Sequence, residues 1–325
     1  MAVTVRDVAR QAGVSAMTVS NVLRGKAGTF GSATRDKVLA AAEELGYRGS
    51  ALPTAMRSGV FDTVALIAGS NLAELWISGQ MIDGIHDALD AHCKRLLYCK
   101  LLARHLTAVS DGELPAIMRE THADGVLING QPDGFDHQVA KNLRHYPVVF
   151  LNGRHEYDSV YPDDVMAGRI AYDYLRDRGC RNIAYVTRFA ASHHSMVDRM
   201  EGFLAAAGSE PVALFIPPAG ERQTEQQLWE AEGARLMSSD VDGVFCYCQN
   251  EAHDLCLWAM QHGRSDLIIT LVNERPYVFG ASYLPTVTMP MRGIGQRGVE
   301  MLMRRIAGGP SQKAEVLPVS MVEPG

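Results

Sequence analysis

The side chains best placed to do chemistry lie on one face of a short segment near the amino terminus, residues 15–24. If this segment is helical, Val19, Val22 and Leu23 turn inward, and the opposite face carries short polar groups and one flexible side chain. That outward face consists of Ser15, Ala16, Met17, Thr18, Ser20, Asn21 and Arg24. Such groups can reach the base edges and phosphates of a DNA major groove, so the segment is predicted to be a recognition helix.

A capped helix precedes this segment and would hold it in place. Thr4 is followed three residues later by Asp7, which is the spacing of a capping box. The apolar positions of this helix follow i, i+3, i+4, i+7 spacing and are Val5, Val8, Ala9 and Ala12. One face of the helix is therefore predicted to be buried.

A tight turn joins the two helices. Gly13 ends the first helix where a left-handed conformation costs little, Val14 fills the corner, and Ser15 caps the second helix. The pattern from residue 4 to residue 23 is that of a helix-turn-helix.

The distribution of charge separates the first 60 residues from the rest. They contain eight Arg and Lys residues and four acidic residues, a net charge of +4, whereas the whole chain of 325 residues carries −6. The remainder therefore carries −10, which places the attraction for phosphate at one end of the chain. The alternative interpretation is a three-helix interaction module without nucleic acid, and this asymmetry argues against it.

The pattern continues into a third helix and a following segment. The helix begins at Ser32 and extends to about Tyr47, and residues 50–59 read Ser-Ala-Leu-Pro-Thr-Ala-Met-Arg-Ser-Gly. With these features the chain closely resembles the lactose-repressor/galactose-repressor (LacI/GalR) family of bacterial transcription regulators. The resemblance implies a headpiece over residues 1–49 and a hinge over residues 50–61, with a short helix that folds when two protomers lie side by side on DNA. It also implies that Met56, where the family usually has Leu, is inserted into a central minor-groove step.

From residue 62 onward, short apolar runs alternate with longer amphipathic segments, the pattern of a parallel sheet with helices on both faces. The expected strands are 63–68, 95–101, 125–129, 148–152, 182–187, 212–216, 243–248 and 267–272. The expected helices are 77–92, 111–122, 135–145, 164–178, 196–207, 224–238, 250–262 and 292–307. At 47% hydrophobic content, the chain can bury a small head and a large body.

Local family motifs recur through this body, among them Asp163-Asp164, residues 199–203 and residues 285–290. The resemblance therefore implies an α/β two-lobed, periplasmic-binding-protein-like effector domain with parallel sheets flanked by helices. Lobe one would comprise residues 62–153 and 289–311. Lobe two would comprise residues 154–288 and 312–325.

A ligand in such a fold lies between the lobes, against loops at the carboxyl ends of the strands. The candidate effector-binding residues at these ends are Trp76, Ser78, Asn129, Asn152, His193, Ser195, Arg199, Asn250 and Asn273. Trp76 could stack on a sugar ring or nucleobase. Arg199 matches an arginine that contacts effectors in several family members, and Asn273 stands where relatives often have aspartate.

The chemistry of these side chains favours a small polar effector. Amide groups and nearby carboxylates suit a polyhydroxylated compound. Four neighbouring groups that carry or can carry positive charge are Arg188, His193, His194 and Arg199. They could receive a carboxylate or phosphate, so the expected effector is a sugar or a sugar acid.

No arrangement of residues predicts catalysis. The set Cys246, Cys248, His253 and Cys256 follows no zinc-binding spacing, and buried cysteine acting as a small apolar residue is the better interpretation. No phosphate-binding glycine loop and no nucleophile with a matching base is found. We therefore expect no enzyme activity, no cofactor and no metal site.

The expected location is the cytoplasm, at the nucleoid. No apolar run is long enough to span a membrane, and Met1 leads directly into the capped helix rather than into a leader peptide. The six cysteines would stay reduced there, without disulfides.

Three functions of different classes can be compared. A ligand-controlled transcription regulator explains both head and body, whereas a solute-binding transport protein would explain only the body. An enzyme would need a catalytic constellation that is not found. The expected function is thus a repressor of carbohydrate or sugar-acid metabolism genes; a family regulator responding to a nucleobase, or a solute-binding protein, is the alternative.

The DNA partner is expected to be an inverted-repeat operator bound by a homodimer. Ala16, Met17 and Asn21 would set the half-site preference. Phosphate contacts are expected from Ser15, Thr18, Ser20, Thr34 and Arg35. Thr4, Arg24 and Met56 complete the candidate DNA-binding set.

Overall fold

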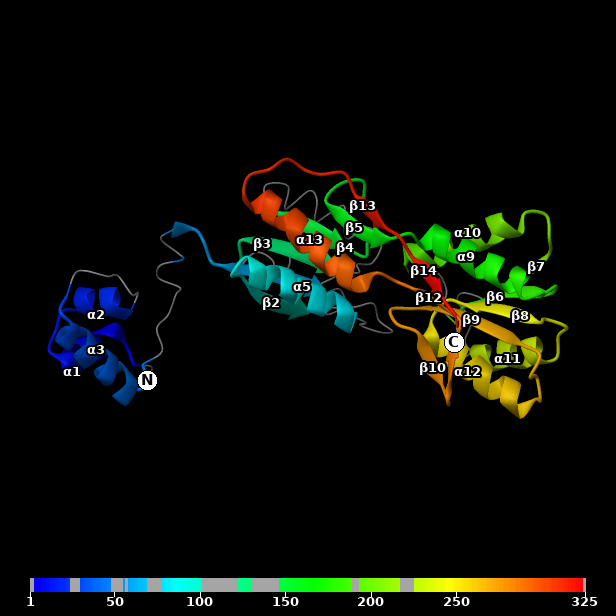
Figure 1. Ribbon diagram of the computed structural model, residues 1–325, viewed down its shortest axis with the longest axis horizontal. Helices are drawn as coiled ribbons and strands as arrows, with labels where there is room; N and C mark the ends of the chain where they lie inside the picture. Colours follow the sequence, from blue (N-terminus) through cyan, green and yellow to red (C-terminus); the bar gives the residue numbers. More distant parts are fainter. Residues whose placement is uncertain are drawn as a thin grey trace. The chain divides into compact units, whose positions relative to one another are not determined.

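The computed structural model describes residues 3–23, 30–47, 55, 58–68, 77–100, 122–129, 146–188, 193–216 and 225–323. They belong to two compact units, Met1–Phe61 and Asp62–Gly325 (Figure 1). Most of the predicted hinge, residues 50–54, 56 and 57, lies outside the described residues.

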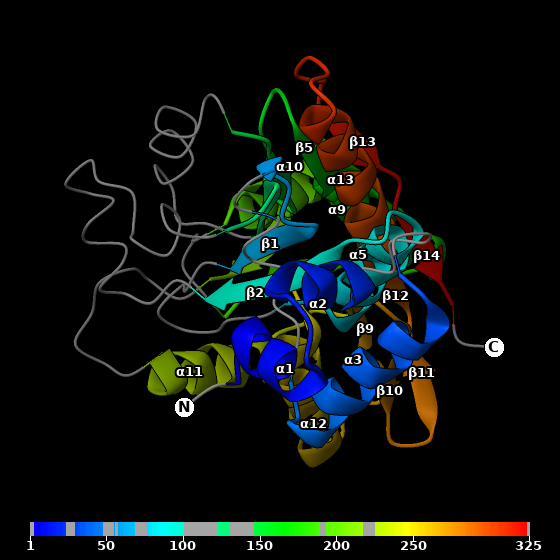
Figure 2. The same ribbon diagram turned by 90° about the vertical axis from the view of Figure 1, so that its left-hand side faces the viewer.

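The first unit contains α1 (Val5–Ala12), α2 (Ala16–Leu23) and α3 (Ser32–Glu44) (Figure 2). The predicted capping box is present: Oγ1 of Thr4 accepts a hydrogen bond from the Asp7 amide at 3.4 Å, and the Asp7 carboxylate accepts one from the Thr4 amide at 3.0 Å. Gly13 ends α1 with a φ of 65°, in the left-handed region. Oγ of Ser15 accepts from the Thr18 amide at 3.1 Å, so it caps α2 as predicted.

Each of the three helices contributes to one small core. Val8, Val19 and Val38, one from each helix, are fully buried. Val22 is buried as predicted, but Leu23, which we expected to turn inward, is 36% exposed. Leu23 is the last residue of α2, and a helix end is less enclosed by neighbouring helices than the middle of a helix.

The second unit contains two six-stranded sheets. The first has the order β13-β5-β4-β3-β1-β2 and is parallel throughout. Its strands are β1 (Thr63–Ala68), β2 (Arg95–Lys100), β3 (Gly125–Asn129), β4 (Val148–Leu151), β5 (Ser159–Pro162) and β13 (Glu315–Leu317). The expected strands 63–68 and 125–129 are found with the same bounds.

The second sheet has the order β14-β12-β9-β8-β6-β7 and is parallel except at β14, which pairs antiparallel with β12. Its strands are β6 (Ile183–Val186), β7 (Val212–Phe215), β8 (Gly243–Cys246), β9 (Ile268–Asn273), β12 (Thr286–Thr288) and β14 (Ser320–Val322). An antiparallel hairpin, β10 (Tyr277–Phe279) with β11 (Ser282–Leu284), stands apart from both sheets.

The helices described in this unit lie close to their expected positions. They are α5 (Gly79–Ala91), α9 (Asp164–Asp177), α10 (His194–Ala207), α11 (Glu225–Met237), α12 (Gln249–Gln261) and α13 (Met291–Ile306). The expected helix 135–145 lies outside the described residues, as does the expected helix 111–122 except for its last residue.

Each sheet with its helices forms a lobe, and the chain passes between the lobes three times. The sequence placed the first passage near residue 153, but β5 still belongs to the first sheet, so the chain leaves lobe one only at α9. The last passage lies between β13 and β14, after residue 317 rather than near residue 311. With four and three residues, β5 and β13 are too short to give a periodic signal.

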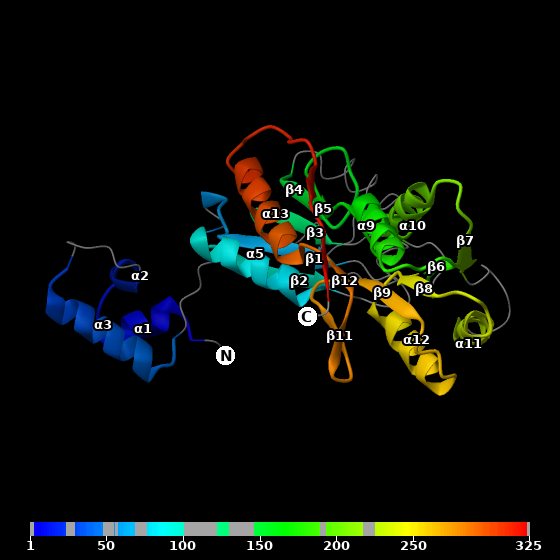
Figure 3. The same ribbon diagram turned by 45° about the vertical axis from the view of Figure 1, so that its right-hand side comes forward.

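A close helix crossing supports each lobe, with α5 beside α13 in lobe one and α9 beside α10 in lobe two (Figures 1 and 3). A Cβ added to Gly168 of α9 would lie 2.0 Å from the Arg199 carbonyl oxygen, and one added to Gly202 of α10 would lie 1.9 Å from the Val165 carbonyl oxygen. These glycines let the backbones of α9 and α10 touch, which brings the start of α9 against the middle of α10.

Candidate functional site

The predicted recognition face of α2 is open to solvent. Ser15, Ala16 and Met17 are exposed, and the Met17 side chain is 70% exposed, which is unusual for a large apolar residue. Thr18, Ser20 and Asn21 are half-buried on the same helix. An exposed apolar side chain among polar ones is typical of a surface that binds a partner. Contact between these residues and DNA bases stays a prediction.

The other predicted DNA contacts are less uniform. The Thr4 hydroxyl donates to the Asp7 carboxylate at 2.7 Å, so a phosphate contact by Thr4 would have to compete with the capping box. Thr34 is half-buried and Arg35 is exposed, both in the first turn of α3. Arg24 and Met56 lie outside the described residues, as does the effector candidate Trp76.

In lobe two, Arg199 is the centre of a buried polar cluster. Its Nε donates to Oδ1 of Asp164 at 2.7 Å, and its Nη1 donates to the carbonyl oxygen of Tyr247 at 2.9 Å. The guanidinium also lies 4.6 Å from the centre of the Tyr247 ring. Burial disfavours the charge, but the Asp164 carboxylate favours it, and the pKa of Arg199 is raised overall. Nη2 makes no hydrogen bond to any residue that the structure describes, so its two N–H groups could donate to a ligand.

A chain of hydrogen bonds leads from lobe one into this cluster. Nε2 of His193 lies 3.0 Å from the carbonyl oxygen of Asn152, and its Nδ1 lies 2.8 Å from Oγ of Ser195. Because a carbonyl only accepts, Nε2 carries the proton, and the Ser195 hydroxyl donates to Nδ1. Oγ of Ser195 in turn lies 2.8 Å from the Tyr247 hydroxyl, which donates to it. The positions of His193, Ser195 and Tyr247 are thus mutually fixed.

His194 is half-buried beside this chain and is uncharged at neutral pH. Burial, with the nearby His193 and Arg154, lowers the pKa of His194 to about 3. Its Nε2 lies 3.8 Å from Oδ2 of Asp164, too far for a hydrogen bond. Arg188 is engaged as well, with Nη1 3.7 Å from a carboxylate oxygen of Asp254. The cations expected to bind an anionic effector are therefore neutral or already paired.

The remaining predicted effector residues occupy several strand ends. Asn129 ends β3 and is 6% exposed; Asn273 ends β9, and Asn250 lies in the first turn of α12, both half-buried. Asn152 joins the cluster through its main-chain carbonyl rather than through its amide side chain. Ser78 caps α5 and donates to the Glu274 carboxylate, so its hydroxyl is already used within the protein. The structure thus brings together His193, Ser195 and Arg199.

Two residues important to this cluster, Asp164 and Tyr247, were missed as site residues. The pair at 163–164 was noted only as a motif, and the structure separates its roles: Asp163 caps α9 by accepting from the Met166 amide at 2.9 Å, while Asp164 faces Arg199. Tyr247 was missed because it follows β8 among apolar residues that look like a buried run. Its hydroxyl and its position next to a strand end were the available signals.

A buried carboxylate stabilises the start of α12. Glu251 is fully buried and accepts from the amides of Cys248 at 3.2 Å and Arg188 at 3.1 Å, and from the Cys248 thiol at 2.7 Å. Burial raises the pKa of Glu251. These contacts tie the loop after β6 to the loop after β8, at the same edge of the sheet as Arg199.

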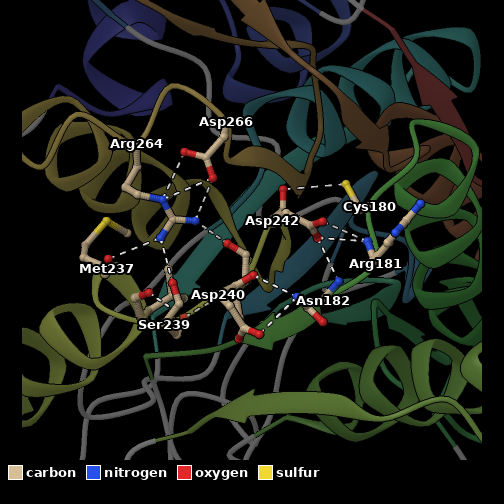
Figure 4. Close-up of polar contacts among 11 residues, drawn as sticks. Cys180, Arg181, Asn182, Met237, Ser239, Asp240, Asp242, Arg264 and Asp266 are labelled. Atoms are coloured by element: carbon tan, nitrogen blue, oxygen red, sulfur yellow. Dashed lines mark hydrogen bonds and ion pairs between the residues drawn. The ribbon is translucent and has the colours of Figure 1, made fainter.

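At the opposite, amino edge of the lobe-two sheet lies a second polar cluster (Figure 4). Arg264 donates to the carbonyl oxygens of Met237, Ser239 and Val241, and to the carboxylate of Asp266 at 2.9 Å. The Asp242 carboxylate accepts from the amides of Arg181 and Asn182 at 2.9–3.0 Å. The polar groups at the amino edge of the sheet thus bond to one another, which stabilises the turns that enter the strands.

Within the described part of the chain, no group of three or more His, Cys, Asp or Glu residues is arranged to hold a metal ion. The helices described there also include none long and apolar enough to cross a membrane.

Two family models match the chain. The model described as bacterial regulatory proteins, lacI family, matches residues 4–50, and that of the periplasmic binding protein-like domain matches residues 172–325. Among curated proteins, the chain is 30% identical over 274 residues to the maltose regulon regulatory protein MalI of Escherichia coli, covering 81% of this chain and 76% of MalI. It is 26% identical to the transcriptional regulator GalS of Salmonella typhimurium, covering 94% of this chain and 91% of GalS.

Solved structures agree on the fold. The lac repressor dimer bound to operator and the anti-inducer ONPF matches with a TM-score of 0.78 at 20% identity, covering 100% of this chain and 98% of that one. The regulator CelR in complex with cellobiose matches with a TM-score of 0.65 at 22% identity, covering 99% of both chains. The curated relatives are transcription regulators and not enzymes. The chain belongs to the LacI/GalR family of bacterial regulatory proteins and is a ligand-responsive transcriptional repressor.

Proposed function

We propose that this repressor binds an inverted-repeat operator as a homodimer in the cytoplasm, and that an uncharged, hydroxyl-rich small molecule of the sugar class controls it. The observation that carries the effector class is the state of Arg199. Its charge is balanced by Asp164, while Nη2 remains available to a ligand. A neutral acceptor such as a sugar hydroxyl suits this donor, whereas an anion would have to compete with the Asp164 carboxylate.

Relatives support the same class of effector. CelR was solved with cellobiose, and a LacI-family regulator of Enterococcus faecium was solved with ribose. The neutral His194 and the paired Arg188 provide no uncompensated positive charge for a sugar acid. A polyhydroxylated neutral ligand would use Arg199 together with the amides of Asn129 of lobe one and of Asn250 and Asn273 of lobe two.

In the head, the exposed face of α2 would lie in the major groove, with two heads reading the two half-sites. Asn21→Ala should relax base preference at one half-site position, while Arg35→Ala should weaken binding to all sequences alike and reduce its salt dependence. Selection from random DNA, followed by affinity measurements at two salt concentrations, checks both. The reverse pattern would contradict the assignment of base and phosphate contacts.

The dimer would form through exposed apolar side chains in lobe two. Val278 and Tyr283 face each other across the β10–β11 hairpin and are 51% and 54% exposed, and Met260 of α12 is 72% exposed. Tyr283→Asp should shift the protein from dimer to monomer in sedimentation experiments and lower its operator affinity by about tenfold or more, because one head alone binds weakly. An unchanged dimer would rule this surface out.

The effector is tested by thermal shift of the full chain against neutral sugars, sugar acids, phosphorylated sugars and nucleobases. A ligand of the folded state raises the melting temperature. We expect a neutral sugar to do so, and we expect Arg199→Lys, which keeps the charge but not the guanidinium fork, to abolish the shift. A response confined to sugar acids, phosphorylated sugars or nucleobases would overturn the proposed class.

A further inference from the structure

Among the contacts that the described residues make between the two lobes, two correspond to each other in the fold. Strands β4 and β9 hold the same position in their sheet orders, and so do β1 and β6. The loop after β4 of lobe one contacts α10, which follows β6. The segment after β9 of lobe two contacts α5, which follows β1. Each lobe therefore presents a strand end to the first turns of a helix in the other lobe.

The two contacts differ in chemistry. In one, the hydroxyl of Ser78 donates to the Glu274 carboxylate, and Nε2 of Gln80 donates to the Glu274 carbonyl at 3.1 Å. In the other, Nη1 of Arg154 donates to Oδ1 of Asp198 at 2.6 Å, beside the contact between His193 and the main chain of residue 152. Only the second contact joins two opposite charges across the lobes.

Asp198 depends on its partner in lobe one. It is 4% exposed, and among the described residues Arg154 is the group that donates to its carboxylate. Burial raises the pKa of Asp198, as expected for a carboxylate held away from water. If the lobes separated at this point, α10 would retain a buried charge without a partner, which is unfavourable.

We propose that Arg154 and Asp198 form a charged latch that holds the lobe-one loop 152–154 against the first turns of α10. The latch acts on the same helix that carries His193, Ser195 and Arg199. Movement between the lobes is therefore transmitted to the effector residues through α10, and this consequence rests on the proposed function. Because Asp198 is adjacent to Arg199 in α10, the relative position of the two lobes and the binding of an effector influence each other.

The latch is tested in the full chain without DNA or effector, by hydrogen–deuterium exchange of Arg154→Met, Asp198→Asn and the double variant. Arg154→Met should speed amide exchange in residues 194–200 of lobe two by about threefold or more, because its loss frees the start of α10. Asp198→Asn should do the same for residues 152–158 of lobe one. The double variant should resemble either single variant, since both remove one interaction.

Arg178→Met is the matched control. It removes an ion pair with Glu323 that lies wholly within lobe two, so exchange in both segments should stay at the wild-type rate. The latch is overturned if each single variant affects only its own lobe, or if the effects multiply in the double variant. Since no ligand is used, an effector panel without a neutral-sugar response would overturn the proposed function and leave this result standing.

Discussion

Arg199 and Arg264 stand at opposite edges of the lobe-two sheet and use the same guanidinium chemistry with different results. Arg264 bonds to three main-chain carbonyls and to Asp266, which lies two residues away (Figure 4). Arg199 bonds to one carbonyl and to Asp164 of a different helix, and it leaves Nη2 without a described partner. The amino-edge arginine is a structural clamp, whereas the carboxyl-edge arginine is fixed in orientation and still able to bind.

The difference also lies in which elements supply the partners. Those of Arg264 come from the turns that enter β8 and β9 and from the turn after α11. Arg199 relies on α9, the helix that enters lobe two from lobe one. An arginine positioned by a helix that joins two lobes is sensitive to their arrangement, which a clamp within one lobe is not.

The largest expected effect comes from removing the carboxyl-edge arginine. Arg199→Met should lower the free energy of unfolding by about 3–5 kcal/mol, because it leaves Asp164 buried without its partner. Adding Asp164→Asn should recover most of this loss. Urea denaturation followed by circular dichroism checks both variants, and an Arg199→Met protein as stable as the wild type would contradict the cluster described here.

A smaller effect is expected at the amino edge. Arg264→Met should lower the free energy of unfolding by about 2 kcal/mol, since it removes several hydrogen bonds but leaves the exposed Asp266 carboxylate in contact with water. The thermal shift caused by an effector should be unchanged in size. A loss of the effector-induced thermal shift in this variant would contradict the assignment of Arg264 to a purely structural role.

The last expected effect depends on pH. The pKa of His194 is near 3 in the folded protein and near 6.5 when unfolded, so unfolding takes up a proton between these values. The stability contributed by the neutral ring is complete above about pH 6.5 and declines as the pH falls towards 3. His194→Gln should make unfolding less pH-dependent in this range than in the wild type, which urea denaturation at several pH values checks.

The sequence predicted the long elements well because their signals are local. The helix-turn-helix follows from a cap, a glycine and an apolar period, and all are present at residues 4–23. Strands such as β1 and β3 are unbroken apolar runs bounded by polar residues. Strands β5 and β13 have no such pattern, since sheet neighbours distant in sequence decide where they pair.

The candidate site was only partly predictable for the same reason. Arg199 could be identified by resemblance, but its partners Asp164 and Tyr247 lie 35 and 48 residues away along the chain. The neutral state of His194 depends on burial, which a sequence position does not reveal. The expectation that Arg199 and its neighbours could bind an anion was made without knowledge of the Asp164 carboxylate beside Arg199.

The close crossing of α9 and α10 at Gly168 and Gly202 has a consequence for engineering. Because α9 and α10 meet backbone to backbone, that crossing depends on the absence of side chains and not on the identity of those around it. Residues 193, 195 and 247 can therefore be varied in a library for new effectors while the α9–α10 crossing itself is kept. The two glycines are the positions such a biosensor scaffold must keep.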